Sequence, residues 1–162
     1  ATAKKGGTVV IPSFAVGRAQ TVLHLIYKLK QAKAIPDIPI YLDSPMAVDA
    51  TNIMQKHSAE HRLPKDICKD VCGIARYIKT NEDSKALHDI SLPKVIISAS
   101  GMAEGGRVLH HIKFYAPDGK NAIVFVGFQA SSTRGEKMLD GASHVKIHGE
   151  MVSLRCRIEM LD

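Results

Sequence analysis

Three arginines occupy the same kind of position, each after a short apolar run and a turn rich in small residues. Arg18, Arg107 and Arg134 stand where the sequence predicts the first turn of a helix. A positive charge there opposes the helix dipole and costs roughly 0.3–1 kcal/mol at an exposed site. Three such placements indicate that the guanidinium groups serve a ligand, most simply phosphate groups. The alternative is that each arginine pairs with a nearby acid; the candidates are Asp43, Glu104 and Glu136.

The turns that precede these helices share a composition of Gly, Ser, Pro and Thr, at residues 12–21, 43–47, 98–107 and 127–136. Such turns let backbone N–H groups point outward and meet an anion. The predicted phosphate-binding residues are Arg18, Ser98, Ser100, Gly101, Gly105, Gly106, Arg107, Gln129, Thr133 and Arg134.

Three further polar residues could face a cleft formed by these turns, namely Asp43, Ser44 and His110. Asp43 follows a predicted strand, where a carboxylate can take part in catalysis. An Asp-Ser-Pro turn is also an ordinary helix cap, so both roles stay open for Asp43. His110 and His111 are adjacent and therefore point apart, one of them toward the cleft and the other toward the surface or core.

Histidine spacing suggests one metal site, which the sequence does not complete. His57 and His61 are four residues apart, so on a helix they share a face. No third ligand is identifiable, and a solvated helical face is the alternative. We therefore predict neither a metal-binding nor a catalytic residue in this chain.

The three cysteines, Cys68, Cys72 and Cys156, form no Cys-x-x-Cys pair. An odd count without such a pair predicts reduced thiols packed among apolar side chains. Neither a phosphate loop of the Gly-x-x-x-x-Gly-Lys-Ser/Thr type nor a Gly-x-Gly-x-x-Gly fingerprint is present.

The composition favours an anionic partner but no broad stacking surface. The formal net charge is +6, and the basic residues are spread along the chain. Aromatic residues make up 5% with no tryptophan, so a platform for stacked bases is not expected. For Phe14, Tyr115 and Phe128 we expect core packing, with isolated ligand contacts as the alternative.

Four apolar, β-branched runs predict strands buried on both faces, at residues 8–12, 38–42, 94–99 and 122–127. Helical periodicity follows at least three of them; the apolar positions are Val22, Ile26 and Leu29, then Val48, Ile53 and Met54, then Val108, Ile112 and Tyr115. Alternating strands and helices predict an α/β fold with a Rossmann-like open parallel sheet and helices on both faces.

Two segments depart from this alternation. Residues 57–93 have weak patterning and many charges, and we expect one or two helices that leave the sheet. Residues 143–149 and 151–161 alternate in polarity on either side of the Gly149-Glu150 step, which predicts a hairpin or edge strands. Because we find no repeat or linker, residues 1–162 are predicted to form a single domain.

The ends of the chain favour a piece of a longer protein, since it opens with Ala1 and closes directly after an alternating stretch. No run approaches about eighteen apolar residues and no leader opens the chain, so we expect neither a membrane helix nor a signal peptide. A cytoplasmic location is the corresponding expectation.

Five ordered motifs resemble the β-CASP region of RNA-processing nucleases of the metallo-β-lactamase fold, of bacterial type. They read "VVIPSFAVGRAQ", "PIYLDSPMA", "VIISASGMAEGGRVLHHI", "IVFVGFQASSTRGEKMLDGA" and "VKIHGEMVSLRCRIEML". The group includes the cleavage and polyadenylation endonuclease and ribonuclease J relatives. The resemblance covers nearly the whole chain and is weakest over residues 57–93.

The resemblance implies a cap inserted into a metallo-β-lactamase domain of the same parent chain, with RNA in the cleft between them. It implies two zinc ions held by a His-x-His-x-Asp-His motif in that other domain, and residues 151–160 as a strand returning to it. The motif is absent here, and "KIHGE" does not match the family's last histidine motif in position, so His148 is not assigned to it. The parent would hydrolyse RNA phosphodiesters as a metal-dependent ribonuclease, with a homodimer left open, whereas this chain would be inactive alone.

One departure from the family pattern concerns the turn "GFQASST". Relatives commonly have Gly-Tyr-Gln-Ala-x-Gly-Thr, and this chain has Ser132 in place of the second glycine. Two other functions stay open: a free-standing Rossmann-like module that binds a nucleotide or phosphorylated small molecule, and a protein–protein adaptor.

Overall fold

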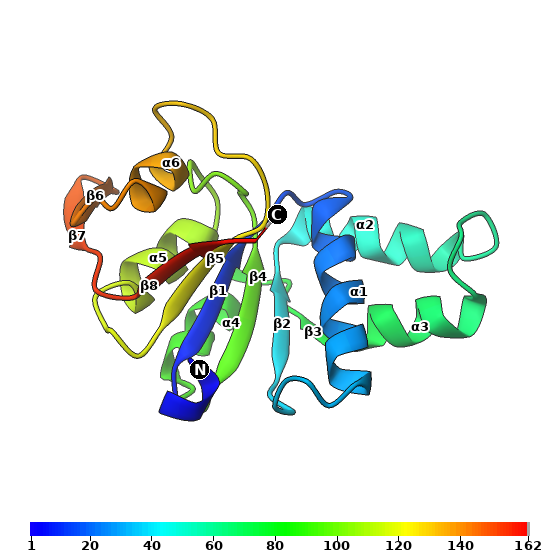
Figure 1. The fold of residues 1–162 in the computed structure, drawn as a ribbon. Helices are drawn as coiled ribbons and strands as arrows, with labels where there is room; N and C mark the ends of the chain where they lie inside the picture. Colours follow the sequence, from blue (N-terminus) through cyan, green and yellow to red (C-terminus); the bar gives the residue numbers. More distant parts are fainter. Residues whose placement is uncertain (162) are drawn as a thin grey trace.

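A parallel sheet of six strands forms the centre of the protein, as a computed structural model describing residues 1–161 shows (Figure 1). The strands lie in the order β3-β2-β4-β1-β5-β8. Their bounds are β1 Thr8–Pro12, β2 Ile40–Asp43, β3 Ala75–Tyr77, β4 Lys94–Ser98, β5 Ala122–Phe125 and β8 Arg157–Met160. The predicted α/β class with a parallel sheet is confirmed.

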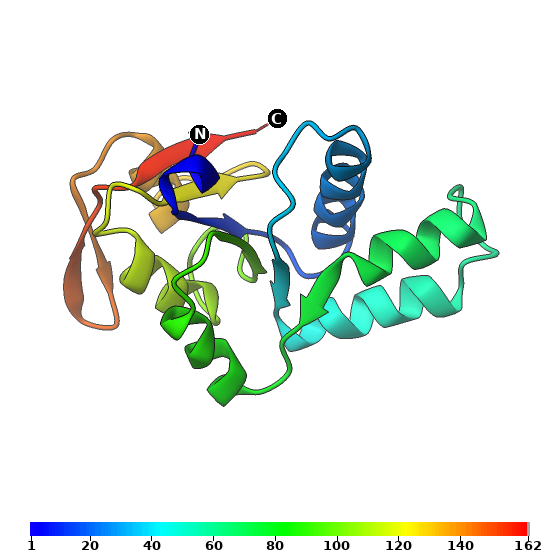
Figure 2. The same ribbon diagram turned by 90° about the horizontal axis from the view of Figure 1, so that it is seen from below.

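Helices cover both faces of the sheet. One face carries α1 (Arg18–Gln31), α2 (Pro45–Lys56) and α3 (Lys65–Gly73), and α2 and α3 run side by side on the right of Figures 1 and 2. The other face carries α4 (Asn81–Ala86), α5 (Val108–Tyr115) and α6 (Arg134–Leu139). Short 3-10 helices, η1 (Ala3–Lys5) and η2 (Leu87–Asp89), precede β1 and follow α4. None of these helices is both long and apolar enough to cross a bilayer within the described residues.

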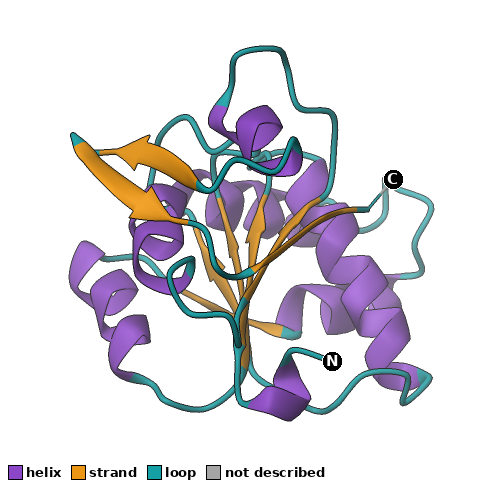
Figure 3. Ribbon diagram, turned by 60° about the vertical axis from the view of Figure 1, so that its left-hand side comes forward, coloured by secondary structure: helices purple, strands orange, loops and turns teal. Residues whose placement is uncertain are grey.

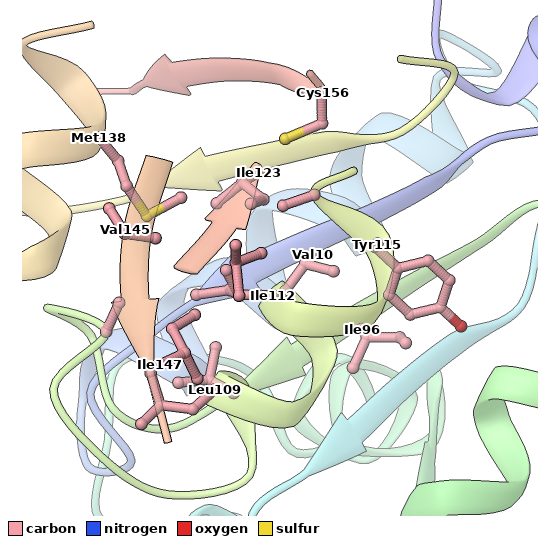
Figure 4. Close-up of a cluster of buried hydrophobic side chains, with 14 of the residues drawn as sticks. Val10, Ile96, Leu109, Ile112, Tyr115, Ile123, Met138, Val145, Ile147 and Cys156 are labelled. Atoms are coloured by element: carbon pink, nitrogen blue, oxygen red, sulfur yellow. The ribbon is translucent and has the colours of Figure 1, made fainter. Parts of the chain in front are cut away.

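Side-chain alternation along the strands builds two separate cores. In β1 and β4, Val10 and Ile96 face the α5 side, while Ile11 and Ile97 face the α1 side. On the α5 side, Ile112 packs into the cluster with the strand residues (Figure 4). This two-sided burial explains why the strands are apolar at consecutive positions.

The segment 57–93 differs from our expectation. It contains helices α3 and α4, but it also returns to the sheet, because β3 pairs with β2 in parallel through Tyr41 and Arg76. Three residues, one of them charged, are too few for periodicity to reveal a strand. The expectation of an excursion made only of helices was therefore wrong.

The carboxyl-terminal segment contains both of the predicted alternatives. Strands β6 (His144–Ile147) and β7 (Glu150–Ser153) form an antiparallel hairpin that stands apart from the main sheet (Figure 3). The turn between them has positive φ at His148 (49°) and Gly149 (82°), as a two-residue hairpin turn requires. Strand β8 then joins the edge of the main sheet beside β5.

The direction of the crossovers creates a switch point between β1 and β4. Helix α1 leaves β1 on one face and α5 leaves β4 on the other, although these strands are neighbours. In open parallel sheets, ligands bind at the carboxyl edge near such a point. All four predicted turns lie at this edge.

Candidate functional site

A buried carboxylate organises the carboxyl edge of the sheet. The side chain of Asp43, the last residue of β2, has no exposed surface. It accepts hydrogen bonds from Ser84 Oγ (2.5 Å), Arg107 NH1 (2.8 Å) and His111 Nε2 (2.6 Å). Its backbone carbonyl accepts one from Ser98 Oγ (2.7 Å). Asp43 thus connects β2, β4, α4 and α5, and its carboxylate does not face solvent.

Electrostatics explain how this carboxylate stays charged. Burial alone would raise the pKa of the Asp43 carboxyl, but the hydrogen bonds from His111, Ser84 and Arg107 outweigh burial and lower that pKa. The Arg107 side chain is itself only 15% exposed, so the pair is shielded from water. A buried carboxylate is tolerated only with such compensation.

Arg107 also fixes the chain that leads into α4. Its guanidinium donates to the carbonyls of Ile78 (3.3 Å) and Lys79 (2.9 Å) and to Asn81 Oδ1 (3.1 Å). The predicted ion pair with Asp43 is therefore present, and most of the donors of this guanidinium are used inside the protein.

A second buried contact extends the network to η2. His111, with no exposed surface, places Nδ1 3.0 Å from Nε2 of His88, so one ring donates to the other. The His88 ring stacks on Phe114 with ring centroids 4.2 Å apart. Burial lowers the pKa of His88 to about 4, helped by the neighbouring His111 and His110. His88 is therefore neutral at physiological pH.

The turn after β4 uses its small residues for its own packing. Ser100 Oγ accepts hydrogen bonds from the backbone N–H of Glu104 (3.1 Å) and Gly105 (3.3 Å). A Cβ on Gly101 would lie 3.0 Å from Phe14, and one on Gly106 would lie 2.6 Å from the carbonyl oxygen of Ala99. The amides of Glu104 and Gly105 are thus already bonded within the turn.

The turn after β5 is similar. Gln129 Nε2 donates to the carbonyls of Gly101 (3.1 Å) and Gly127 (2.9 Å), which connects the two turns. Thr133 caps α6 by accepting from the N–H of Glu136 (3.2 Å). Arg134 donates through its backbone N–H to Glu104 Oε1 (2.5 Å). These bonds join the turn after β5 to the turn after β4 and to the start of α6.

Arg134 forms the second predicted ion pair. Its NH1 lies 3.1 Å from Glu104 Oε2, and its Nε donates to the carbonyl of Lys146 (2.7 Å). Its side chain remains 28% exposed, about twice the exposure of Arg107.

Arg18 differs from both. Its residue is exposed, and within residues 1–161 its side chain takes part in no ion pair or hydrogen bond. A Cβ on Gly127 would lie 3.7 Å from Arg18 Nε, so the guanidinium lies beside the turn after β5. Of the three arginines, Arg18 offers the most donors to a ligand.

Apolar side chains are exposed along the same edge. Phe14, in the turn after β1, is 48% exposed, and Phe128, in the turn after β5, is 72% exposed. Our expectation of core packing was wrong for these two residues and right for Tyr115, which is 5% exposed.

The remaining candidates are placed away from an open cleft. Ser44 is the N-cap of α2 and accepts from the N–H of Ala47 (3.3 Å). Asp43 is thus part of the buried network, and the capping side chain is its neighbour. His110 is exposed and its ring lies 4.7 Å from that of His148, while His111 points into the interior.

Comparison with known proteins assigns the family. The sequence profile of the Beta-Casp domain matches residues 19–138. The chain belongs to the Beta-Casp family. The resemblance seen in the five motifs is thereby confirmed.

Several curated proteins share this Beta-Casp domain. The chain is 36% identical to "Ribonuclease TTHA0252" of Thermus thermophilus. The aligned region covers 99% of this chain and 38% of that protein. It is 36% identical to "Transcription termination factor FttA" of Methanocaldococcus jannaschii, over 90% of the chain and 24% of that protein. It is 29% identical to the "RNase J-like protein" of the same organism, over 99% of the chain and 38% of that protein. The chain thus spans well under half the length of these relatives.

His57 and His61, the candidate metal ligands of this Beta-Casp domain, have other contacts in the structure. Residues 1–161 hold no group of three or more His, Cys, Asp or Glu side chains placed for a metal ion. Helix α2 ends at Lys56, so His57 and His61 do not share a helical face; His57 pairs with Glu60, and His61 contacts Cys68 Sγ at 3.3 Å. All three cysteines are buried and free.

The departure at Ser132 has a structural meaning in the Beta-Casp domain. Ser132 has φ of 70°, in the left-handed region that favours glycine. This is the position where the resemblance predicts glycine, and the backbone keeps the conformation that glycine would adopt.

Replacing Asp43 with Asn should destabilise the domain strongly, because Arg107 would be left buried without a counter-charge. We expect Asp43→Asn to lower the free energy of unfolding by about 3–5 kcal/mol, measured by urea denaturation. Asp37→Asn is the matched control, because Asp37 also pairs with a cation, Lys30, but its own side chain is 96% exposed. The control should change stability far less, because an ion pair exposed to solvent contributes little. Equal effects of both variants would contradict our account of the buried pair.

The pKa of His88 predicts a loss of stability in acid. Unfolded histidine binds a proton below about 6.5, whereas folded His88 does so only below about 4. Between these values the unfolded state binds more protons, so the free energy of unfolding falls as pH falls from 6.5 to 4. His88→Gln keeps a hydrogen-bonding partner for His111 and does not titrate. The variant should show a shallower decline than the unchanged protein over this window, and parallel curves would exclude His88 as the cause.

Ser132→Gly should stabilise the domain, because it removes a side chain from a left-handed position. The relief of about 1–2 kcal/mol exceeds the added flexibility of glycine, so we expect a net gain of roughly 0.5–1 kcal/mol in urea denaturation. Ser131→Gly is the matched control, because Ser131 is also exposed and has no positive φ. That control should lose stability; a loss in both variants would contradict the explanation.

Proposed function

We propose that this chain is the RNA-binding domain of a larger metal-dependent ribonuclease. Two relatives that cover 99% of the chain are named as ribonucleases, and each is more than twice as long as the matched segment. The observation that carries the proposal is the Beta-Casp match over residues 19–138. The parent chain would hydrolyse RNA phosphodiester bonds.

The charges of the domain support an anionic substrate. The formal net charge is +6, and Arg18 lies exposed beside the turn after β5. Positively charged side chains bind the RNA backbone without regard to sequence and release counterions as they do so. Of Arg18 and Arg107, we assign Arg18 to phosphate, because Arg107 is held by Asp43.

Exposed aromatic rings support contact with bases. Phe14 and Phe128 follow β1 and β5, which are neighbouring strands, so both rings belong to the carboxyl edge. Stacking of one base on an aromatic side chain contributes about 1–3 kcal/mol. An exposed ring in each of two turns gives single-stranded RNA two points of contact that carry no charge.

We propose that hydrolysis itself needs residues outside this chain. In the parent, two zinc ions held by a metallo-β-lactamase domain would activate the attacking water. The residues of this domain would bind and orient the RNA strand. The isolated chain would then bind RNA without cutting it.

The isolated chain should bind single-stranded RNA with an affinity that falls as salt rises. Arg18→Ala should reduce the slope of log affinity against log salt by about one unit, because one phosphate contact is lost. Phe128→Ala should weaken binding roughly 5- to 150-fold and leave the slope unchanged, because stacking carries no charge. Fluorescence anisotropy with a labelled oligonucleotide over a salt series measures both.

Lys4→Ala is the control for charge, because Lys4 lies in η1, which precedes the amino end of β1. It should leave affinity and slope nearly unchanged. Absence of RNA binding would refute the proposal, and so would RNA cleavage that survives chelation and repurification. A change of slope in Phe128→Ala would refute the assignment of stacking.

A further inference from the structure

A basic hollow lies between α6 and the β6–β7 hairpin, next to the turn after β4. Its volume is about 350 Å³, which is within the range of small-ligand pockets. The lining residues come from three elements, α6, β6 and β7, and from the turns after β4 and β5: Glu104, Ser132, Arg134, Lys137, His144, Val145, Lys146 and Met151. None of the lysines or histidines here was singled out from the sequence.

The charges of this hollow are unbalanced. Arg134, Lys137 and Lys146 supply three cations, and Glu104 is the one carboxylate among the lining residues. Glu104 is already paired with Arg134. Lys137 and Lys146 are both exposed, and within residues 1–161 neither takes part in an ion pair. An anion would therefore find two uncompensated ammonium groups and a guanidinium in one place.

The scaffold of the hollow is rigid. Arg134 is fixed through Nε to the carbonyl of Lys146 (2.7 Å) and through NH1 to Glu104. The hairpin that carries Lys146 is anchored by Val145 and Ile147, which are 3% and 0% exposed and point into the core near Ile112 and Leu109 (Figure 4). Because neighbouring residues of a strand face opposite sides, this anchoring turns Lys146 outward. The cations are thus presented by ordered elements.

Two other hollows near the end of α1 lack this charge excess. One is lined by Lys30, Lys69 and Asp70, and the other by Lys30, Lys33 and Asp37. Lys30 is paired with Asp37 at 2.7 Å. Each of these hollows therefore has one more cation than carboxylates among its lining residues, whereas the hollow beside α6 has two more.

We propose that the hollow between α6 and the hairpin binds a phosphate group of the RNA strand, through Arg134, Lys137 and Lys146. This inference rests on the proposed function and extends it, because Glu104 and Ser132 place the hollow beside the turns after β4 and β5. RNA that crosses the carboxyl edge would continue over α6 onto the hairpin. Met151, 65% exposed at the rim, gives an apolar surface to the adjoining ribose or base.

The test compares two double variants that each remove two positive charges. Lys137→Ala/Lys146→Ala empties the hollow of its free cations, and Lys33→Ala/Lys69→Ala removes one lysine from each of the hollows near α1. Binding of a labelled single-stranded uridine oligonucleotide is measured by anisotropy over a salt series. The first variant should bind roughly 10-fold more weakly and show a slope smaller by about two units. The second should match the unchanged protein.

The outcomes separate this inference from the proposed function. Equal behaviour of the two variants, with RNA bound normally by the unchanged chain, overturns the hollow and leaves the RNA-binding function standing. No RNA binding by the unchanged chain refutes the function itself. Uridine monophosphate and inorganic phosphate serve as competitors: displacement of RNA by uridine monophosphate at equimolar concentration would assign the hollow to a free nucleotide and overturn its assignment to RNA. Urea denaturation of both variants checks that they are folded.

Discussion

The buried charge of Asp43 is the constraint on which the carboxyl edge of the sheet depends. A carboxylate removed from water must recover its lost hydration from neighbouring donors. These donors come from α4, from α5 and from Arg107, the last residue of the turn between β4 and α5. Hydrogen bonding to one carboxylate therefore fixes three segments at once. Arg107, the cationic donor, also holds two carbonyls of the chain before α4. The least regular part of the sequence, residues 57–93, is tied to the sheet in this way.

The three arginines share a sequence position but differ in their surroundings. Arg107 is used by the interior, Arg134 is divided between Glu104 and a basic hollow, and Arg18 lies exposed beside Gly127. The glycines follow a similar rule. Gly101 and Gly106 allow the turn to pack against itself, so their small size serves the protein's own backbone. Only part of an apparently ligand-directed motif is therefore free to meet a ligand.

Sequence patterns predicted the sheet because four strands are buried on both faces and read as continuous apolar runs. The sequence did not predict β3, because three residues, one of them charged, are too few to show a period. The Asp43 network escaped for a different reason: Asp43, Ser84 and His111 are far apart along the chain and meet only through the crossovers. Adjacent histidines after a helix start were a usable signal, since one of them had to point inward. The basic hollow could not be predicted, because its unpaired cations, Lys137 and Lys146, lie on a helix and on a hairpin. They come together only when the hairpin packs beside α6.

The placement of β1 at the centre of the sheet has a consequence for folding. Thr8 pairs with Lys94 and Val9 pairs with Ala122, so β1 pairs with strands that come much later in the chain. The β6–β7 hairpin is a local pairing, whereas the main sheet depends on contacts between distant parts of the chain. Such topologies fold slowly, because long loops must close before their contacts form. Until β4 and β5 are in place, β1 stays an unpaired apolar segment, and such segments are prone to aggregation during folding.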